Sequence, residues 1–135
     1  YIVMHAISLP ELQRKVLALL KSERNSCTPA QLAMLEDRIL VFSGKKQIYG
    51  TQFDWDKNGV LNPFPIEHLG DVDSRRKQVG LPPLSETVVE HRDRANREGE
   101  RAPANFAVYT KLREDWMLKV GWIRDRSEID SAFYS

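Results

Sequence analysis

The stretch DRILVFSGKKQIYGTQFDW, residues 37–55, gathers more chemically active side chains around a turn than any other part of the chain. Its run ILVF, residues 39–42, is predicted to end a helix that stops at Gly44, with a short strand as the alternative. From Gln47 the residues alternate with a period of two, which predicts a strand through Trp55. This succession of helix, turn and strand makes the stretch the candidate site and the centre of the fold.

Two helices are predicted before the middle of this stretch. Ser8-Leu-Pro-Glu11 has the form of a capping box, so the first helix begins there and ends near Glu23 or Arg24. Its core-facing side is predicted from the three- and four-residue spacing of Leu9, Leu12, Val16, Leu17, Leu19 and Leu20. Its polar side holds Gln13, Arg14, Lys15 and Lys21. Thr28 and Pro29 then start the second helix as its N-cap and first residue.

The chain after residue 55 predicts a second hairpin arm and three more helices. Asn58-Gly59 supplies the hairpin turn, and residues 60–66 form the second arm. A short helix, SRRKQV, follows with Asp71 or Asp73 as its cap, and another helix begins at Ser85. The polar run 92–101 is either a solvated helix face or a mobile loop. The last helix starts after Asn105, ends at Gly121 and has an apolar side made of Phe106, Tyr109, Leu112, Trp116, Met117 and Val120.

These elements predict an α+β fold that is mainly α-helical, with four to five helices packed around one β-hairpin. The length of 135 residues predicts a single domain over residues 1–135, in which residues 123–135 form a peripheral tail. Residues 1–6, YIVMHA, are either the end of a helix that starts upstream or a short strand. Their apolar side chains need a covering partner.

Composition narrows the classes of function. Twenty Lys and Arg residues stand against nineteen Asp and Glu residues, so the formal net charge of +1 does not predict binding to nucleic acid or to a membrane surface. The apolar runs are far shorter than the roughly 20 residues that span a bilayer. The single cysteine, Cys27, cannot form an internal disulfide and has no neighbouring partner for thiol chemistry. We therefore expect a soluble, cytoplasmic protein.

Several motifs resemble those of a bacterial family known as the domain-of-unknown-function 6624 family. They are Asp37-Arg38, Gly44, Gln47, Tyr49-Gly50-Thr51-Gln52, Pro65-Ile66-Glu67, Asp71 or Asp73 before Arg75-Arg76, and Gly80-Leu81 with Pro83-Leu84. His5-Ala6 and the closing WMLKVGW extend the resemblance over most of the chain. The chain departs from the family pattern at His68, where Asp is usual, and in a helical segment that family members carry before the His. A partner chain could cover the face which that segment would occupy.

The resemblance implies a site but no reaction, so two hypotheses follow. The first is a small enzyme that acts on a polar, anionic small molecule by acid–base chemistry without a metal or cofactor. In it the catalytic candidates are His5, Asp37 and Tyr49, and the substrate-binding candidates are Arg38, Gln47, Thr51, Gln52, Glu67, Asp73, Arg75 and Arg76. The second is a non-catalytic small-molecule-binding protein or the accessory subunit of a heteromeric complex.

Each candidate also has a structural interpretation. Asp37 and Arg38 sit beside an apolar helix face, where charges must be paired, so a salt network with Glu67, Asp73, Arg75 or Arg76 explains them equally well. Tyr49 and Gln52 suit a hairpin, with Gly50 at a bulge. Residues 54–59, DWDKNG, copy the first half of a calcium loop, but Pro65 stands where the bidentate Glu should be. We therefore interpret this segment as a hairpin turn and predict no metal site.

Overall fold

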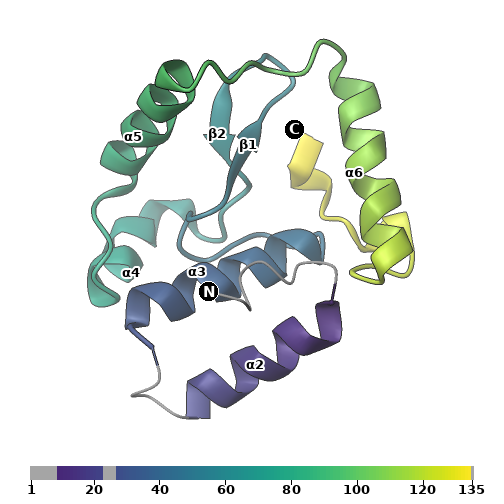
Figure 1. The fold of residues 1–135 in the computed structure, drawn as a ribbon. Helices are drawn as coiled ribbons and strands as arrows, with labels where there is room; N and C mark the ends of the chain where they lie inside the picture. Colours follow the sequence, from purple (N-terminus) through teal and green to yellow (C-terminus); the bar gives the residue numbers. More distant parts are fainter. Residues whose placement is uncertain (1–8, 23–26, 135) are drawn as a thin grey trace.

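The computed structural model describes residues 9–22 and 27–134. In these residues the chain forms five α-helices, one two-stranded antiparallel sheet and three short 3₁₀ helices. Figure 1 shows α3 crossing the middle of the molecule with α2 beside it, and the hairpin standing between α5 and α6. The predicted architecture, mainly helical with one hairpin, is therefore confirmed. The expectations for Tyr1–Ala6, for the Ser8 cap and for a helix end at Glu23 or Arg24 lie outside the described residues.

Helix α3 spans Pro29–Phe42, which confirms the helical interpretation of residues 39–42. Thr28 and Gln31 form the capping box: Thr28 Oγ1 accepts from the Gln31 amide, and the Gln31 side chain accepts from the Thr28 amide. At the other end the amide of Gly44 donates to Val41 O and that of Lys45 to Leu40 O. This pair of bonds is a Schellman motif, and Gly44 supplies its left-handed residue with φ 75°.

Helix α2, Pro10–Ser22, packs on α3, and its buried face matches the predicted one only in part. Gln13, predicted on the polar side, is fully buried, and the same face places Leu17 and Leu20 against the core. The predicted core residues Leu9, Leu12 and Leu19 are exposed by 43% or more. The leucine spacing describes two adjacent stripes, and the one that contains Gln13, Leu17 and Leu20 is the more buried. The predicted face was therefore wrong for Leu9, Leu12, Leu19 and Gln13 but confirmed for Leu17 and Leu20.

The core lies between α3 and the C-terminal part of the chain. It contains Leu35 and Ile39 of α3 together with Met117, Trp122 and Ile123. Phe42 joins it through an edge contact with the Trp116 ring and a tilted contact with the Trp122 ring, at centroid distances of 5.3 and 5.5 Å. Helix α6, Phe106–Val120, is capped by Asn105 and ends at Gly121 as predicted. Leu112, however, is 64% exposed, because Trp116 and Met117 mark the side of α6 that faces the core.

The hairpin is shorter than predicted. Strand β1 covers only Phe53–Trp55 and pairs in antiparallel register with β2, Leu61–Pro63. The predicted strand from Gln47 was wrong for residues 47–52, which form an irregular loop with one isolated bridge between Gln47 and Ile66. The Asn58-Gly59 turn is present, and Asp56 Oδ1 accepts from the amides of Asn58 and Val60 within it. The carboxylate of Asp56 thus closes a hairpin turn.

Helices α4, Val72–Gln78, and α5, Leu84–Arg97, follow the hairpin and lie against each other. Asp71 occupies the N-cap position of α4, but its side chain makes no capping hydrogen bond there. The carboxylate of Asp73 instead accepts from the Leu84 amide at 2.8 Å and so anchors the start of α5. Helix α5 runs through much of the polar run 92–101, which settles that segment as helix up to Arg97. Its His91 ring stacks on Phe53 of the hairpin at 4.0 Å.

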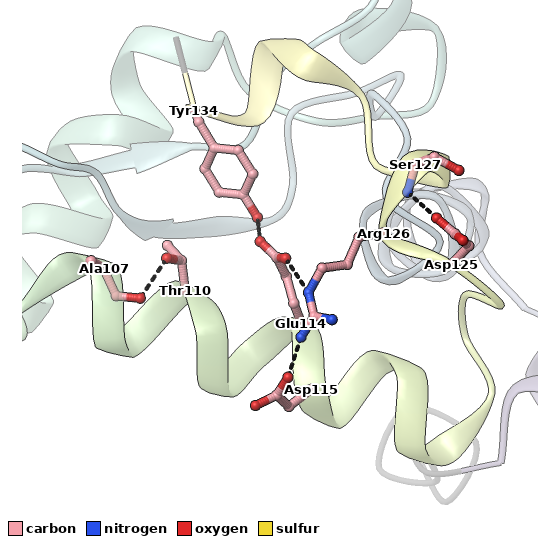
Figure 2. A network of polar contacts seen from close by, with 8 residues as sticks. All are labelled: Ala107, Thr110, Glu114, Asp115, Asp125, Arg126, Ser127 and Tyr134. Carbon is pink, nitrogen blue, oxygen red and sulfur yellow. Dashed lines mark hydrogen bonds and ion pairs between the residues drawn. The ribbon is translucent and has the colours of Figure 1, made fainter.

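Residues 123–134, expected at the periphery, contact both the core and α6. Ile123 is only 3% exposed, and the Asp130 amide donates to Gly44 O at 2.7 Å. Figure 2 shows Arg126 reaching Glu114 and Asp115 of α6, while the Tyr134 hydroxyl donates to the same Glu114. This C-terminal segment lies beside α6 and faces the hairpin in Figure 1.

Substitution of Gly44 tests the contact between the α3 terminus and the C-terminal segment. A Cβ at Gly44 would lie 2.8 Å from Ile129 Cα, a backbone atom, in addition to the strain of φ 75°. Gly80→Ala is the matched control, because Gly80 has φ 80° and no atom within 4 Å of its Cβ position. Strain alone costs about 1–2 kcal/mol. In urea unfolding we expect Gly44→Ala to lower the free energy of unfolding by more than Gly80→Ala, and equal losses would contradict this contact.

The stacked His91 predicts a dependence of stability on pH. Burial first, and then the charges of Arg94 and Arg76, lower the pKa of His91, while Glu90 opposes them. The folded state therefore resists a proton that the unfolded state accepts below pH about 6.5, so stability is full above that pH and falls as the pH drops below it. His91→Phe keeps a stacking ring, and we expect it to flatten this acid slope between pH 7.5 and 5.5.

The control for this measurement is His68→Asn. His68 is exposed and has φ 47°, which Asn tolerates. The control variant should keep the wild-type slope of unfolding free energy against pH. A wild-type slope that survives in His91→Phe would rule out His91 as its source.

Candidate functional site

The loop 47–52 is held by one buried carboxylate, that of Asp37 on α3. Asp37 is 0% exposed, and its two oxygens accept from the amides of Ile48, Tyr49 and Thr51 and from the Thr51 hydroxyl, at 2.8–3.2 Å. Burial raises the pKa of the Asp37 carboxyl, and these hydrogen bonds oppose that shift. The loop amides are committed to Asp37 and cannot form a strand ladder, which explains why the predicted strand does not form here.

Two arginines of α4 hold the carbonyl groups of the same loop. Arg75 Nε donates to Ile48 O at 2.9 Å, and its terminal nitrogens donate to the carbonyls of Glu67 and His68. Arg76, only 1% exposed, donates through Nη1 to Tyr49 O at 2.6 Å and Gly50 O at 3.2 Å. Its other nitrogens donate to Pro82 O and the Thr87 hydroxyl. Both guanidinium groups therefore bind backbone and side-chain oxygens of the protein itself.

Gln47 completes this arrangement, which we call the loop clamp: Asp37, Gln47, Arg75 and Arg76. The fully buried Gln47 side chain donates to Gln52 O and Phe64 O and accepts from the Gln52 amide, all at 2.9–3.0 Å. Its backbone bonds to Pro65 O and to the Glu67 amide. The loop clamp thus ties α3, α4 and both ends of the hairpin together without regular secondary structure.

Most of the sequence-predicted site residues do come together at the loop clamp. Asp37, Gln47, Thr51, Arg75 and Arg76 meet there, and the Gln52 side chain reaches Met34 O and Thr51 Oγ1. Burial, and then Glu36 and Asp37, raise the pKa of the Tyr49 phenol. Their roles in catalysis or substrate binding remain predictions.

The remaining predicted residues lie apart from the loop clamp or outside the described residues. The Asp73 carboxylate anchors α5, and the exposed Glu67 carboxylate lies 3.5 Å from His68 Nε2. Arg38 forms no ion pair within the described residues; its guanidinium lies over the Phe42 ring at 5.7 Å. Within the described residues the expected salt network does not form: Asp37 makes no ion pair with Arg75 or Arg76, and Arg38 makes none with Glu67 or Asp73. His5 lies outside the described residues.

A cavity of about 440 Å³ lies on the side of the hairpin that faces α6, between the hairpin, α6 and the C-terminal segment. In the hairpin register Asp54 pairs with Asn62, and both line the cavity. Phe53 on the opposite face stacks on His91 of α5. The polar pair Asp54 and Asn62 thus lies on the cavity side of the hairpin, and Trp55 and Pro63 line the cavity as well. We call this space the hairpin cavity.

The charged side chains that line the hairpin cavity differ in whether they have hydrogen-bond or ion-pair partners. Asp54 accepts from Arg113 Nη1 at 2.8 Å and from the Tyr109 hydroxyl at 2.6 Å, which contributes, after burial, to a raised pKa of Tyr109. The carboxylate of Asp56 is occupied by the hairpin turn and by Asn62. Lys46 and Lys57 also line the cavity and form no ion pair within the described residues. Asp56 likewise forms no ion pair there, so the lining of the cavity carries three cations, Lys46, Lys57 and Arg113, against two carboxylates, Asp54 and Asp56.

Sequence reasoning missed this cavity because its walls are far apart in the chain. The alternation of residues 53–55 does place Asp54 and Phe53 on opposite faces of the strand, and the predicted hairpin places Asp54 near residues of the second arm. Nothing in the sequence indicates that Arg113 of α6 or Tyr134 of the C-terminal segment would close the other side. In the described residues no group of three or more His, Cys, Asp or Glu side chains is arranged to hold a metal ion.

The fold and the site define a class: a small, mainly helical protein in which a clamped loop carries a hairpin that faces a polar cavity. Residues 2–96 match the model of the family of unknown function DUF6624, so the chain belongs to this family. Comparisons with curated proteins and with solved structures gave no match. The matched residues contain the loop clamp and the hairpin, whereas α6 and the C-terminal segment lie beyond them. In the described residues no helix is long and apolar enough to cross a membrane.

Asp37→Asn tests the loop clamp. An amide keeps one acceptor oxygen and turns its NH₂ group toward backbone N–H donors, which leaves buried donors unpaired. We expect a loss on the order of 3 kcal/mol in the free energy of unfolding, measured in urea. Glu36→Gln is the matched control: it removes the neighbouring carboxylate, whose only described ion pair is with the half-exposed Lys21, and should cost less than about 1 kcal/mol. Equal losses would show that Asp37 is not a structural centre.

Proposed function

We propose that the protein binds a small anionic molecule in the hairpin cavity. The observation that carries this proposal is the charge balance of the cavity: its carboxylates are occupied by protein donors, while Lys46 and Lys57 have no described ion-pair partner. A volume of about 440 Å³ suits a small ligand, since ligand sites commonly range over about 300–1,000 Å³. The ligand's negative charge would be held by the lysines and by Arg113.

The geometry favours binding over acid–base catalysis. A general base needs a lone pair that can reach a substrate proton. Both oxygens of Asp37 already accept hydrogen bonds from the loop, and Asp54 is paired with Arg113 and Tyr109. The enzyme hypothesis remains a prediction that depends on His5 and Tyr49. The partner chain expected over residues 1–6 likewise remains a prediction, because those residues lie outside the described part of the chain.

Two lysine substitutions test the proposed function. The double variant Lys46→Gln with Lys57→Gln removes both lysine charges from the cavity. The control is Lys45→Gln with Lys77→Gln, which makes the same change in net charge at exposed positions that do not line it. Binding of benzoate and of inorganic phosphate is followed by NMR titration, using the indole N–H of Trp55, the one tryptophan that lines the cavity.

We expect the cavity variant to bind both anions about tenfold more weakly and the control to match the wild type, since each exposed charge contributes up to about 1 kcal/mol. Binding should also weaken as salt concentration rises. If the two variants lost affinity equally, or if neither anion shifted the Trp55 resonance in the wild type, the proposed function would be wrong.

A further inference from the structure

We infer that the hairpin cavity selects an aromatic carboxylate, a planar ring that carries a carboxylate group. This inference rests on the proposed function and adds the chemical class of the ligand. Two features of the cavity carry it: the share of aromatic side chains in its walls, and the way in which the guanidinium of Arg113 is held.

The walls of the cavity are rich in rings. Five of its sixteen lining residues are aromatic, compared with 9% of the whole chain: Trp55, Phe64, Phe106, Phe133 and Tyr134. They come from the hairpin, from the start of α6 and from the C-terminal segment, so they surround the space from separate sides. Phe64 and Phe133 contact each other in this wall, with ring centroids 5.6 Å apart. A flat ring can stack against or meet such walls edge-on, which a saturated ring of equal charge does less well.

Arg113 supplies a rigid anion-binding group within these walls. Its guanidinium lies over the rings of Phe64 and Tyr109, at 5.2 and 5.9 Å, and its Nη1 donates to Asp54 at 2.8 Å. The side chain is only 16% exposed. Nη1 donates to Asp54 and the Tyr134 hydroxyl also hydrogen-bonds the Arg113 side chain, and these two partners leave some of the five N–H donors of the guanidinium for a ligand. A carboxylate matches that fork with two parallel bonds.

The two features point to one ligand shape because they share Phe64. A carboxylate bound in the plane of the guanidinium carries its ring next to the Phe64 ring, over which Arg113 already lies. The carboxylates of the cavity do not compete for the same donors, since Asp54 takes Nη1 and Asp56 is held in the hairpin turn. Lys46 and Lys57 then add attraction without fixing the orientation of the anion.

The test compares matched probes on the full chain. Benzoate, cyclohexanecarboxylate and benzamide differ in one property each: cyclohexanecarboxylate lacks the flat ring, and benzamide lacks the charge. Each is titrated while the Trp55 indole resonance is followed. We expect benzoate to bind about three- to tenfold more tightly than cyclohexanecarboxylate, and more tightly still than benzamide.

Two variants connect these preferences to residues. Arg113→Lys keeps the charge but loses the fork, and should weaken benzoate about tenfold. Arg124→Lys, the same exchange at an exposed residue that does not line the cavity, is its control. Phe64→Leu keeps an apolar wall and should erase the preference for benzoate over cyclohexanecarboxylate. The melting temperature of each variant is measured first, so that only folded protein is compared.

The outcomes separate the inference from the proposed function. Equal affinity for benzoate and cyclohexanecarboxylate in the wild type would overturn the inference while leaving anion binding in place. Unchanged benzoate affinity in both Arg113→Lys and Phe64→Leu would overturn it as well. Failure of benzoate and phosphate alike to bind at Trp55 would overturn the proposed function together with the inference.

Discussion

The buried carboxylate of Asp37 is the interaction on which the rest of the structure depends. A loop inside a protein exposes backbone amides that must find partners, because an unpaired buried N–H costs about 1–3 kcal/mol. Asp37 supplies acceptors for three amides and a hydroxyl, and Arg75 and Arg76 supply donors for the carbonyls of the same loop. The side chains of Asp37, Arg75 and Arg76 therefore satisfy backbone groups of this loop, which hydrogen bonds to a neighbouring strand would satisfy in a sheet. Because their charges are met by backbone dipoles, they are stabilised without a direct ion pair.

This arrangement also explains why an irregular segment can position a hairpin. Gly50 takes φ 71° within the loop, and a Cβ there would lie 2.9 Å from Ile66 and 3.0 Å from Leu84. The loop thus packs closely against both the second hairpin arm and the start of α5. The short hairpin that follows has only three residue pairs. Its orientation therefore depends on the loop 47–52 at its start and on α5 and α6, which lie on its two faces.

The features of the fold that could be predicted from the sequence are those set by residues close together in the chain. The Thr28 cap, the Gly44 terminus, the Asn58-Gly59 turn and the Gly121 terminus were all readable because capping and turn chemistry act within a few residues. The loop 47–52 was misread as a strand because its alternation is real, but its amides bind a carboxylate ten or more residues away. The burial of Gln13 on α2 was missed for a similar reason, since the spacing of leucines along one helix does not say which of two adjacent stripes the rest of the chain covers.

The same distinction applies to the site. The sequence brought Asp37, Gln47 and the α4 arginines together correctly, yet their functional and structural interpretations predict the same proximity. What separates the two is whether the side chains keep free donors or acceptors, and that depends on backbone geometry. In the loop clamp the backbone takes them, whereas Lys46, directly before Gln47, remains available at the edge of the hairpin cavity. The clamp therefore supports the proposed ligand site by fixing the chain on both sides of the loop, with Lys46 at one end and Asp54 beyond the other. A family motif dense in polar residues can accordingly mark the support of a site and not the site itself.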